Sequence, residues 1–224
     1  MLPELDITRH NHLVDPSVHV WGWEIPVYLF LGGWVAGNML LTGYFLLGGR
    51  HMRRSPLLSS LPGLSLVLLS LGMGALFLDL EHKAYVWRLY TTFMPTSPMS
   101  WGSWILLLVY PVLALTWLVR PPVILEDLSQ NVARLSAWFR AHRDPVRALG
   151  VTSMVLGTAL GAYTGILLSS LGARPLWNSG ALGVLFLASG VSAAAAFAHL
   201  VTNAPDERAL TVRIDNVVLA SELG

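Results

Sequence analysis

Cysteine is absent from this chain of 224 residues, and charged residues make up only 12% of it. Without cysteine, these residues form no disulfide, no thiolate metal site and no iron–sulfur cluster held by their own thiolates. A formal net charge of +1 also argues against nucleic acid as a partner. Soluble domains carry about 25% charged residues. Half that share, with 54% hydrophobic residues, indicates a chain that lies in lipid.

The first residues lack the features of a signal peptide. They mix acidic residues with proline and histidine, and show neither a basic start nor a small-residue cleavage site. We therefore expect residues 1–24 to stay in the mature chain as an extramembrane segment.

Long apolar runs occupy most of the remaining sequence. A hydrocarbon core of about 30 Å needs roughly 20 apolar residues as helix. Five runs have about this length, at residues 25–47, 56–78, 101–119, 148–171 and 175–201. They predict an all-α, polytopic transmembrane helix bundle, with a first four-helix bundle plus one further span. Residues 202–224 are expected to form a cytoplasmic tail or the start of a sixth span.

Lysine and arginine are distributed unequally between the two predicted sides of the membrane. Ten lie on the side of the loops 48–55 and 120–147 and of the tail, whereas four lie on the other side. The positive-inside rule then places the N-terminus outside, together with the loop 78–104. Within the loop 121–147, apolar residues at helical spacing predict a segment that lies along the inner membrane surface or docks a partner.

Polar residues that touch the membrane gather at the outer ends of the predicted spans. Asp79, Glu81 and His82 stand at the end of the second span, and Tyr163 lies about two turns inside the fourth. Asp79 and His82 are three residues apart, which fits a structural pair as well as a proton relay. Ionisable groups at membrane depth are functional by default. We therefore predict that Asp79, Glu81 and His82 exchange protons.

The histidines do not support haem or zinc. All seven lie in tails, loops or span ends, and their spacing is not that of axial haem ligands or a zinc site. An apolar cavity with aromatic rings, carboxylates, a histidine and a tyrosine instead suits a lipophilic carbonyl compound that takes up protons with electrons, such as a quinone. We expect the Tyr163 hydroxyl to hydrogen-bond a carbonyl oxygen of such a compound, and Arg88 and Trp101 to lie at the same pocket.

Three stretches at these positions resemble the NrfD/polysulfide-reductase membrane-subunit family. They are WGWEIPVYLFLGG at 21–33, SPMSWGSW at 97–104, and AYTGILLSS…RPLWN at 162–178. The resemblance implies an anchor without a redox centre that binds menaquinone or ubiquinone near the outer face of the cell inner membrane. It also implies an iron–sulfur, ferredoxin-like partner outside the membrane, and a molybdopterin catalytic subunit beyond it. By motif position, Tyr163 matches the family's quinone-contacting tyrosine. The resemblance further implies that Glu24, Ile25 and Tyr28, at the start of the first span, line the opposite wall of the quinone pocket.

The predicted function is thus that of a quinone-binding anchor in a respiratory oxidoreductase complex, with proton exchange coupled to electron transfer. The alternative is a purely structural anchor that recruits partner subunits without binding quinone. One departure from the family pattern is the number of spans, because such proteins have eight or more in two bundles. A proton path through a second bundle is therefore not predicted for these residues.

Overall fold

A computed structural model of the chain describes residues 22–49, 55–80, 83–91, 94, 98–169 and 181–223. These residues form helices and no strand. The elements are α1 (Glu24–Leu47), α2 (Leu57–Asp79), a 3-10 turn (Lys83–Tyr85), α3 (Arg88–Thr91), α4 (Pro98–Val119), α5 (Val123–Leu128), α6 (Gln130–Ala141), α7 (Arg143–Ser169), α8 (Ala181–Val201) and α9 (Pro205–Leu223).

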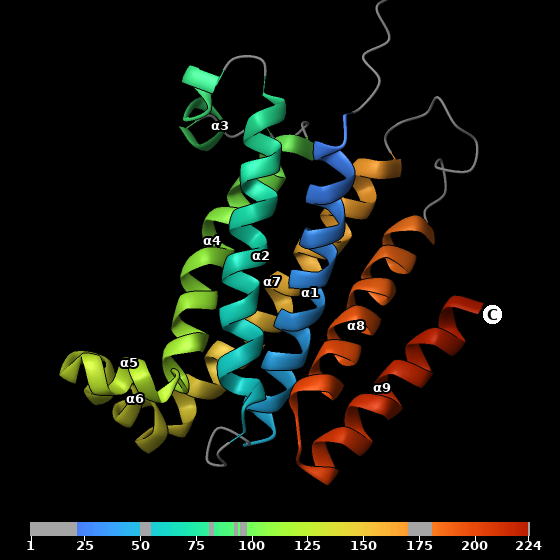
Figure 1. Cartoon of the computed structure of the whole chain (residues 1–224). Coiled ribbons are helices and arrows are strands. Elements are labelled where there is room, and N and C mark those ends of the chain that lie inside the picture. Colours follow the sequence, from blue (N-terminus) through green and yellow to red (C-terminus); the bar gives the residue numbers. More distant parts are fainter. Residues whose placement is uncertain are drawn as a thin grey trace, which may run out of the picture.

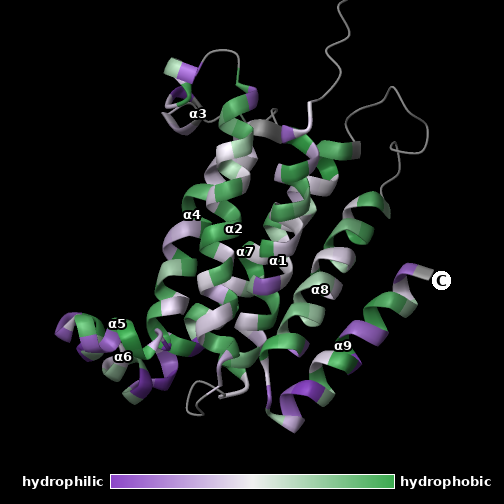
Figure 2. Cartoon of the chain, in the orientation of Figure 1, coloured by the Kyte–Doolittle hydropathy of each residue, from purple (hydrophilic) through white to green (hydrophobic). Residues whose placement is uncertain are grey.

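Among the described residues, five helices are long and apolar enough to cross a membrane: α1, α2, α4, α7 and α8. The predicted all-α membrane bundle with five spans is therefore confirmed, whereas its orientation stays a prediction. The fourth span begins at Arg143 rather than at residue 148, because the helix continues through a polar first turn. The predicted start of the fifth span, residues 175–180, lies outside the described part of the chain. Figure 2 shows the apolar residues along these helices, and more polar residues on α5, α6 and α9.

Helix α1 lies at the centre of the bundle. It packs against α7, α2 and α8, while α4 packs against α7 and α2 (Figure 1). Helices α1, α2, α4 and α7 thus form a four-helix bundle, and α8 covers α1 and α7 on one side. Helix α9 follows α8, and the Ser192 hydroxyl donates a hydrogen bond to the Asp215 carboxylate across this contact (2.5 Å).

Glycine permits close approaches between helices of the bundle. A Cβ atom at Gly37 of α1 would collide with the carbonyl group of Gly190 on α8. A Cβ at Gly157 of α7 would lie 2.9 Å from the Ala36 carbonyl oxygen of α1. Small residues of this kind let helix backbones touch in lipid, where packing and not the hydrophobic effect drives association.

Replacing Gly37 by alanine is expected to destabilise the α1–α8 contact by about 1–3 kcal/mol. The added methyl group would collide with the backbone of α8, which cannot move aside as a flexible side chain can. Thermal unfolding of the purified protein in detergent, followed by circular dichroism, measures this cost. Gly32→Ala is the matched control on the same helix, since a Cβ there meets nothing within 4 Å. Equal melting of the two variants would contradict the proposed close contact.

Asn38 of α1 and Ser153 of α7 each form a hydrogen bond to a neighbouring helix inside the bundle. Asn38 is fully buried in α1, and its Nδ2 donates to Ser65 Oγ of α2 (3.0 Å). Ser65 Oγ in turn donates to the Leu61 carbonyl oxygen (2.7 Å), and Ser153 Oγ of α7 donates to the Met39 carbonyl oxygen of α1 (2.9 Å). In the bilayer core no water is present, so these bonds provide the hydrogen-bond partners of the buried polar groups.

Candidate functional site

Two tyrosines from different helices meet inside the bundle. Tyr28 lies one turn into α1, and Tyr163 lies near the end of α7; their side chains are 4% and 8% exposed. The two side chains form a hydrogen bond with each other. Both residues were predicted to line one pocket, and the structure brings them together although 135 positions separate them in the sequence.

A glycine on each of the two remaining bundle helices lies against the tyrosine pair. On α4, a methyl group at Gly102 would overlap the Tyr163 ring, so this ring lies directly against the helix backbone. On α2, a Cβ at Gly72 would lie 3.8 Å from Tyr28 Cδ2. The pair is therefore enclosed by all four helices of the bundle. Neither glycine is among the predicted site residues, although Gly102 lies in the conspicuous SPMSWGSW stretch.

The same stretch anchors the preceding loop. Ser100 and Ser103 are buried, at 6% and 7% exposed. Ser100 Oγ accepts a hydrogen bond from the Met94 backbone N–H (3.0 Å), and Ser103 Oγ donates to the Ser100 carbonyl oxygen (2.8 Å). This first turn of α4 thus both holds the loop and, through Gly102, seats the Tyr163 ring.

A third tyrosine lies close to the pair. Tyr90 belongs to the short helix α3 and interacts electrostatically with Tyr28. Burial raises the pKa of Tyr90 above its ordinary value, and the neighbouring Tyr110 adds to this shift. Its phenol is therefore neutral at physiological pH and can donate a hydrogen bond. Tyr90 was not predicted, since a tyrosine beside a span is ordinarily an interfacial belt residue.

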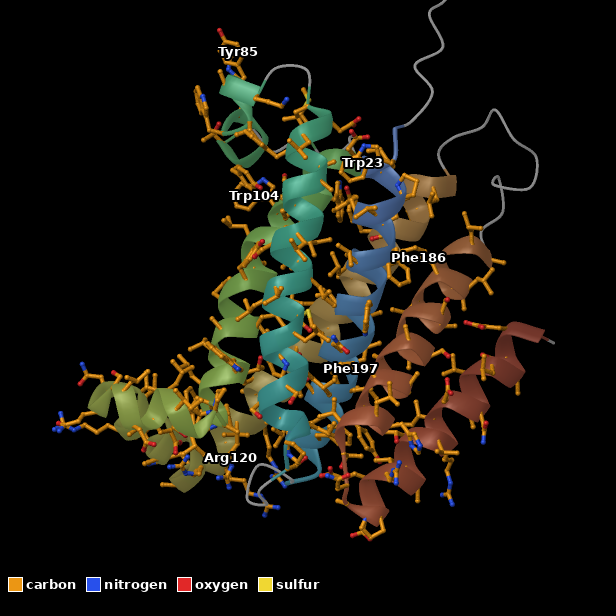
Figure 3. The ribbon with its side chains drawn as sticks, viewed as in Figure 1. Trp23, Tyr85, Trp104, Arg120, Phe186 and Phe197 are labelled. Atoms are coloured by element: carbon orange, nitrogen blue, oxygen red, sulfur yellow. The ribbon has the colours of Figure 1, made fainter. Side chains whose placement is uncertain are left out.

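Arg88 and Trp101 occupy the outer surface of this end. The Arg88 guanidinium lies over the rings of Tyr85 (4.7 Å) and Trp87 (5.7 Å), an arrangement typical of a cation–π contact. Trp101 is 51% exposed on α4. The part of both side chains in a pocket stays a prediction. Figure 3 shows Trp23, Tyr85 and Trp104 at the same end of the molecule, and Arg120 at the opposite end.

Two of the predicted carboxylates, Glu24 and Asp79, lie at helix ends in the described part of the chain. Glu24 begins α1 and is half-buried, with its carboxylate folded back beside Gly22, and Ile25 next to it is also half-buried. Asp79 is the last residue of α2 and is exposed. Glu81 and His82 lie outside the described residues. Within the described part of the chain, no three histidine, aspartate or glutamate side chains are grouped to hold a metal ion.

Comparison with known proteins places these features in a family. A sequence model of the family described as "Polysulphide reductase, NrfD" matches residues 9–219. One of the chains of the polysulfide reductase of Wolinella succinogenes is 32% identical over 179 residues, which cover 78% of this chain and 55% of that protein. Protein NrfD of Escherichia coli (strain K12) is 35% identical over 194 residues, 80% of this chain and 58% of its own length.

A more distant relative is one of the subunits of the tetrathionate reductase of Salmonella typhimurium. It is 28% identical over 185 residues, which cover 81% of this chain and 49% of that protein. The chain thus spans about half the length of the curated relatives it matches. Because the family match covers nearly all of the sequence, this integral membrane chain belongs to the NrfD polysulphide reductase family.

Proposed function

We propose that this chain is the quinone-binding membrane anchor of a respiratory oxidoreductase complex. In this proposal, electrons pass between a quinone or quinol in the four-helix bundle and an iron–sulfur subunit on the outer face of the cell inner membrane. A molybdopterin catalytic subunit completes the complex. Family membership supports the anchor role, and the relatives are named as parts of polysulfide and tetrathionate reductases.

The buried tyrosine pair is the observation that carries the proposal. A hydrogen-bonded pair of phenols contains two O–H groups, and only one of them is used between the two rings. The hydroxyl that accepts this bond keeps its own hydrogen, which it can donate to a carbonyl oxygen. A quinone offers two such oxygens on an apolar ring, and its reduction consumes two electrons and two protons. The pair is therefore suited to orient a quinone ring among apolar helices.

Proton exchange is assigned to the polar residues at the end of α2. Asp79 ends this helix and is exposed, so its carboxylate can pass protons to water. Glu81 and His82 follow it closely in the sequence and extend the set of proton-carrying groups. We assign them, with Glu24 at the start of α1, to proton movement between the pair and the outer aqueous phase.

The partner surface is assigned to the segment that covers this end of the bundle. Tyr85 and Trp87 are each more than half exposed, and Arg88 lies against both rings. Exposed aromatic and arginine side chains are typical of the centres of protein interfaces. An iron–sulfur subunit seated here would bring its cluster close to the tyrosine pair.

A purely structural anchor is the alternative, and one observation favours it. The two tyrosines satisfy each other and are almost fully buried, which is also the arrangement of a bond that only clamps α1 to α7. A clamp would make the hydroxyls matter for stability and not for electron transfer.

The two functions are separated by Tyr28→Phe in the assembled complex. We expect quinone-linked turnover to fall about fivefold, because the Tyr163 hydroxyl loses the partner that orients it, a loss of about 1 kcal/mol. Turnover with an artificial electron acceptor that bypasses the membrane should stay unchanged. Tyr44→Phe on the same helix is the control, since Tyr44 is 47% exposed. Unchanged quinone-linked turnover, with a lowered melting temperature, would favour the structural anchor.

A further inference from the structure

A second polar site lies at the end of the bundle opposite the tyrosine pair. A cavity of about 450 Å³ opens between the first turn of α2, the end of α4 and the short helices α5 and α6. Ser55, Ser59, Arg120, Glu126 and Arg140 contribute its polar walls. None of these residues takes part in the proposed electron transfer.

Two guanidinium groups and one carboxylate set the charge of this cavity. Arg140 Nη1 donates to Glu126 Oε1 (2.8 Å), which also accepts a hydrogen bond from Ser136 Oγ (2.9 Å). The hydrogen bond from Arg140 holds the pKa of Glu126 below its ordinary value, so the carboxylate is charged at neutral pH. The charged side chains that line the cavity are Arg120, Arg140 and Glu126, so their net charge is +1. Among the described residues, Arg140 bonds only through Nη1, which leaves Nη2 and Nε as donors for a ligand.

The arginine is held in place before any ligand arrives. Glu126 comes from α5, whereas Ser136 and Arg140 lie one turn apart on α6. Arg140 Nη1 also contacts the Ser136 hydroxyl, whose oxygen lies 3.2 Å from the Val119 carbonyl oxygen at the end of α4. Three elements thus fix one guanidinium toward the cavity, and a preorganised donor loses little conformational entropy on binding.

Apolar side chains stand beside this charge. Val123 lines the cavity and is 70% exposed, and Ile124 and Leu128 on the same helix are 71% and 76% exposed. Helix α2 begins here at Leu57 and α4 ends here at Val119, so the cavity lies at the depth where hydrocarbon gives way to lipid headgroups. A ligand at this place meets guanidinium groups on one side and lipid-facing apolar surface on the other.

We propose that this cavity binds the headgroup of an anionic phospholipid. Arginine forks match phosphate oxygens, and basic pockets at the membrane interface hold anionic headgroups. The exposed residues of α5 would then contact the acyl chains. A free phosphate ion would use the same donors but not the apolar surface, so binding of lipid and of inorganic phosphate distinguishes the two sources.

The test is a titration of the purified full chain in neutral detergent with phosphatidylglycerol, counting bound lipid by native mass spectrometry. We expect saturable binding of phosphatidylglycerol and none of phosphatidylcholine. Arg120→Gln should weaken this binding about fivefold, the effect of one basic residue near a lipid surface. Arg134→Gln is the matched control, because Arg134 is exposed on α6 and does not line the cavity.

A second variant keeps the test valid if Arg120→Gln folds poorly. Glu126→Gln retains an oxygen that accepts the bond from Arg140 but removes the negative charge, so phosphatidylglycerol should bind about fivefold more tightly. Weaker binding in this variant would overturn the proposal. So would equal losses for Arg120→Gln and Arg134→Gln, or inorganic phosphate that displaces phosphatidylglycerol at equal concentration.

Discussion

Gly102→Ala is expected to lower quinone-linked turnover of the assembled complex about 100-fold. The added methyl group would occupy the space of the Tyr163 ring, so the ring must move away from α4 and take its hydroxyl with it. A displacement of about 1 Å at a reacting centre costs a factor of this size. Steady-state turnover with a water-soluble quinol, alongside turnover with an artificial acceptor, measures the effect.

Gly74→Ala is the control for this variant. Gly74 lies on α2 in the same half of the bundle, and a Cβ there meets nothing within 4 Å. Its turnover and melting temperature should equal those of the unchanged protein. If Gly102→Ala also retains full quinone-linked turnover, Tyr163 is not at the quinone.

Replacing both Tyr28 and Tyr163 by phenylalanine should reduce quinone-linked turnover about 100-fold, more than the product of the two single effects. Each single variant keeps one hydroxyl that can still donate to a carbonyl oxygen, whereas the double variant keeps none. Two hydroxyls that can each replace the other as donor are non-additive in this way, and an unmatched carbonyl oxygen in a buried site costs about 1–3 kcal/mol. A double-mutant cycle of turnover provides the measurement.

The double variant keeps both rings and therefore the packing of α1 against α7. We expect its melting temperature to fall by only a few degrees, since one buried hydrogen bond contributes about 1 kcal/mol. Two outcomes would contradict a shared role of the hydroxyls at the quinone. One is that the effects of the two single variants add up to the effect of the double variant. The other is that turnover with the artificial acceptor falls as much as quinone-linked turnover.

The sequence was sufficient for the membrane architecture, and it singled out two tyrosines that the fold brings together. Length and lack of charge defined five spans, because lipid leaves few alternatives to a long apolar helix. Tyr163 was singled out because a hydroxyl inside an apolar span needs a partner. That its partner is Tyr28 could not be read from the chain, since the two meet only through the packing of α1 against α7.

Other parts of the site depend on three-dimensional packing. Gly102 appeared as an ordinary residue beside a tryptophan, and only the folded helices show the Tyr163 ring against it. Arg88 was predicted to line the pocket, and only the folded chain shows its guanidinium over the rings of Tyr85 and Trp87. An arginine can contact nearby aromatic rings or a ligand, and the sequence alone does not show which of these contacts is formed.

Binding of a quinone analogue to the purified chain in lipid nanodiscs tests the central claim most directly. Our account predicts saturable binding by the unchanged protein and by Tyr44→Phe, and at least about tenfold weaker binding when Tyr28 and Tyr163 are both phenylalanine. Binding of equal strength in the double variant would contradict the assignment of the quinone to the tyrosine pair. Absence of saturable binding in the unchanged protein would show that the chain serves only as a structural anchor.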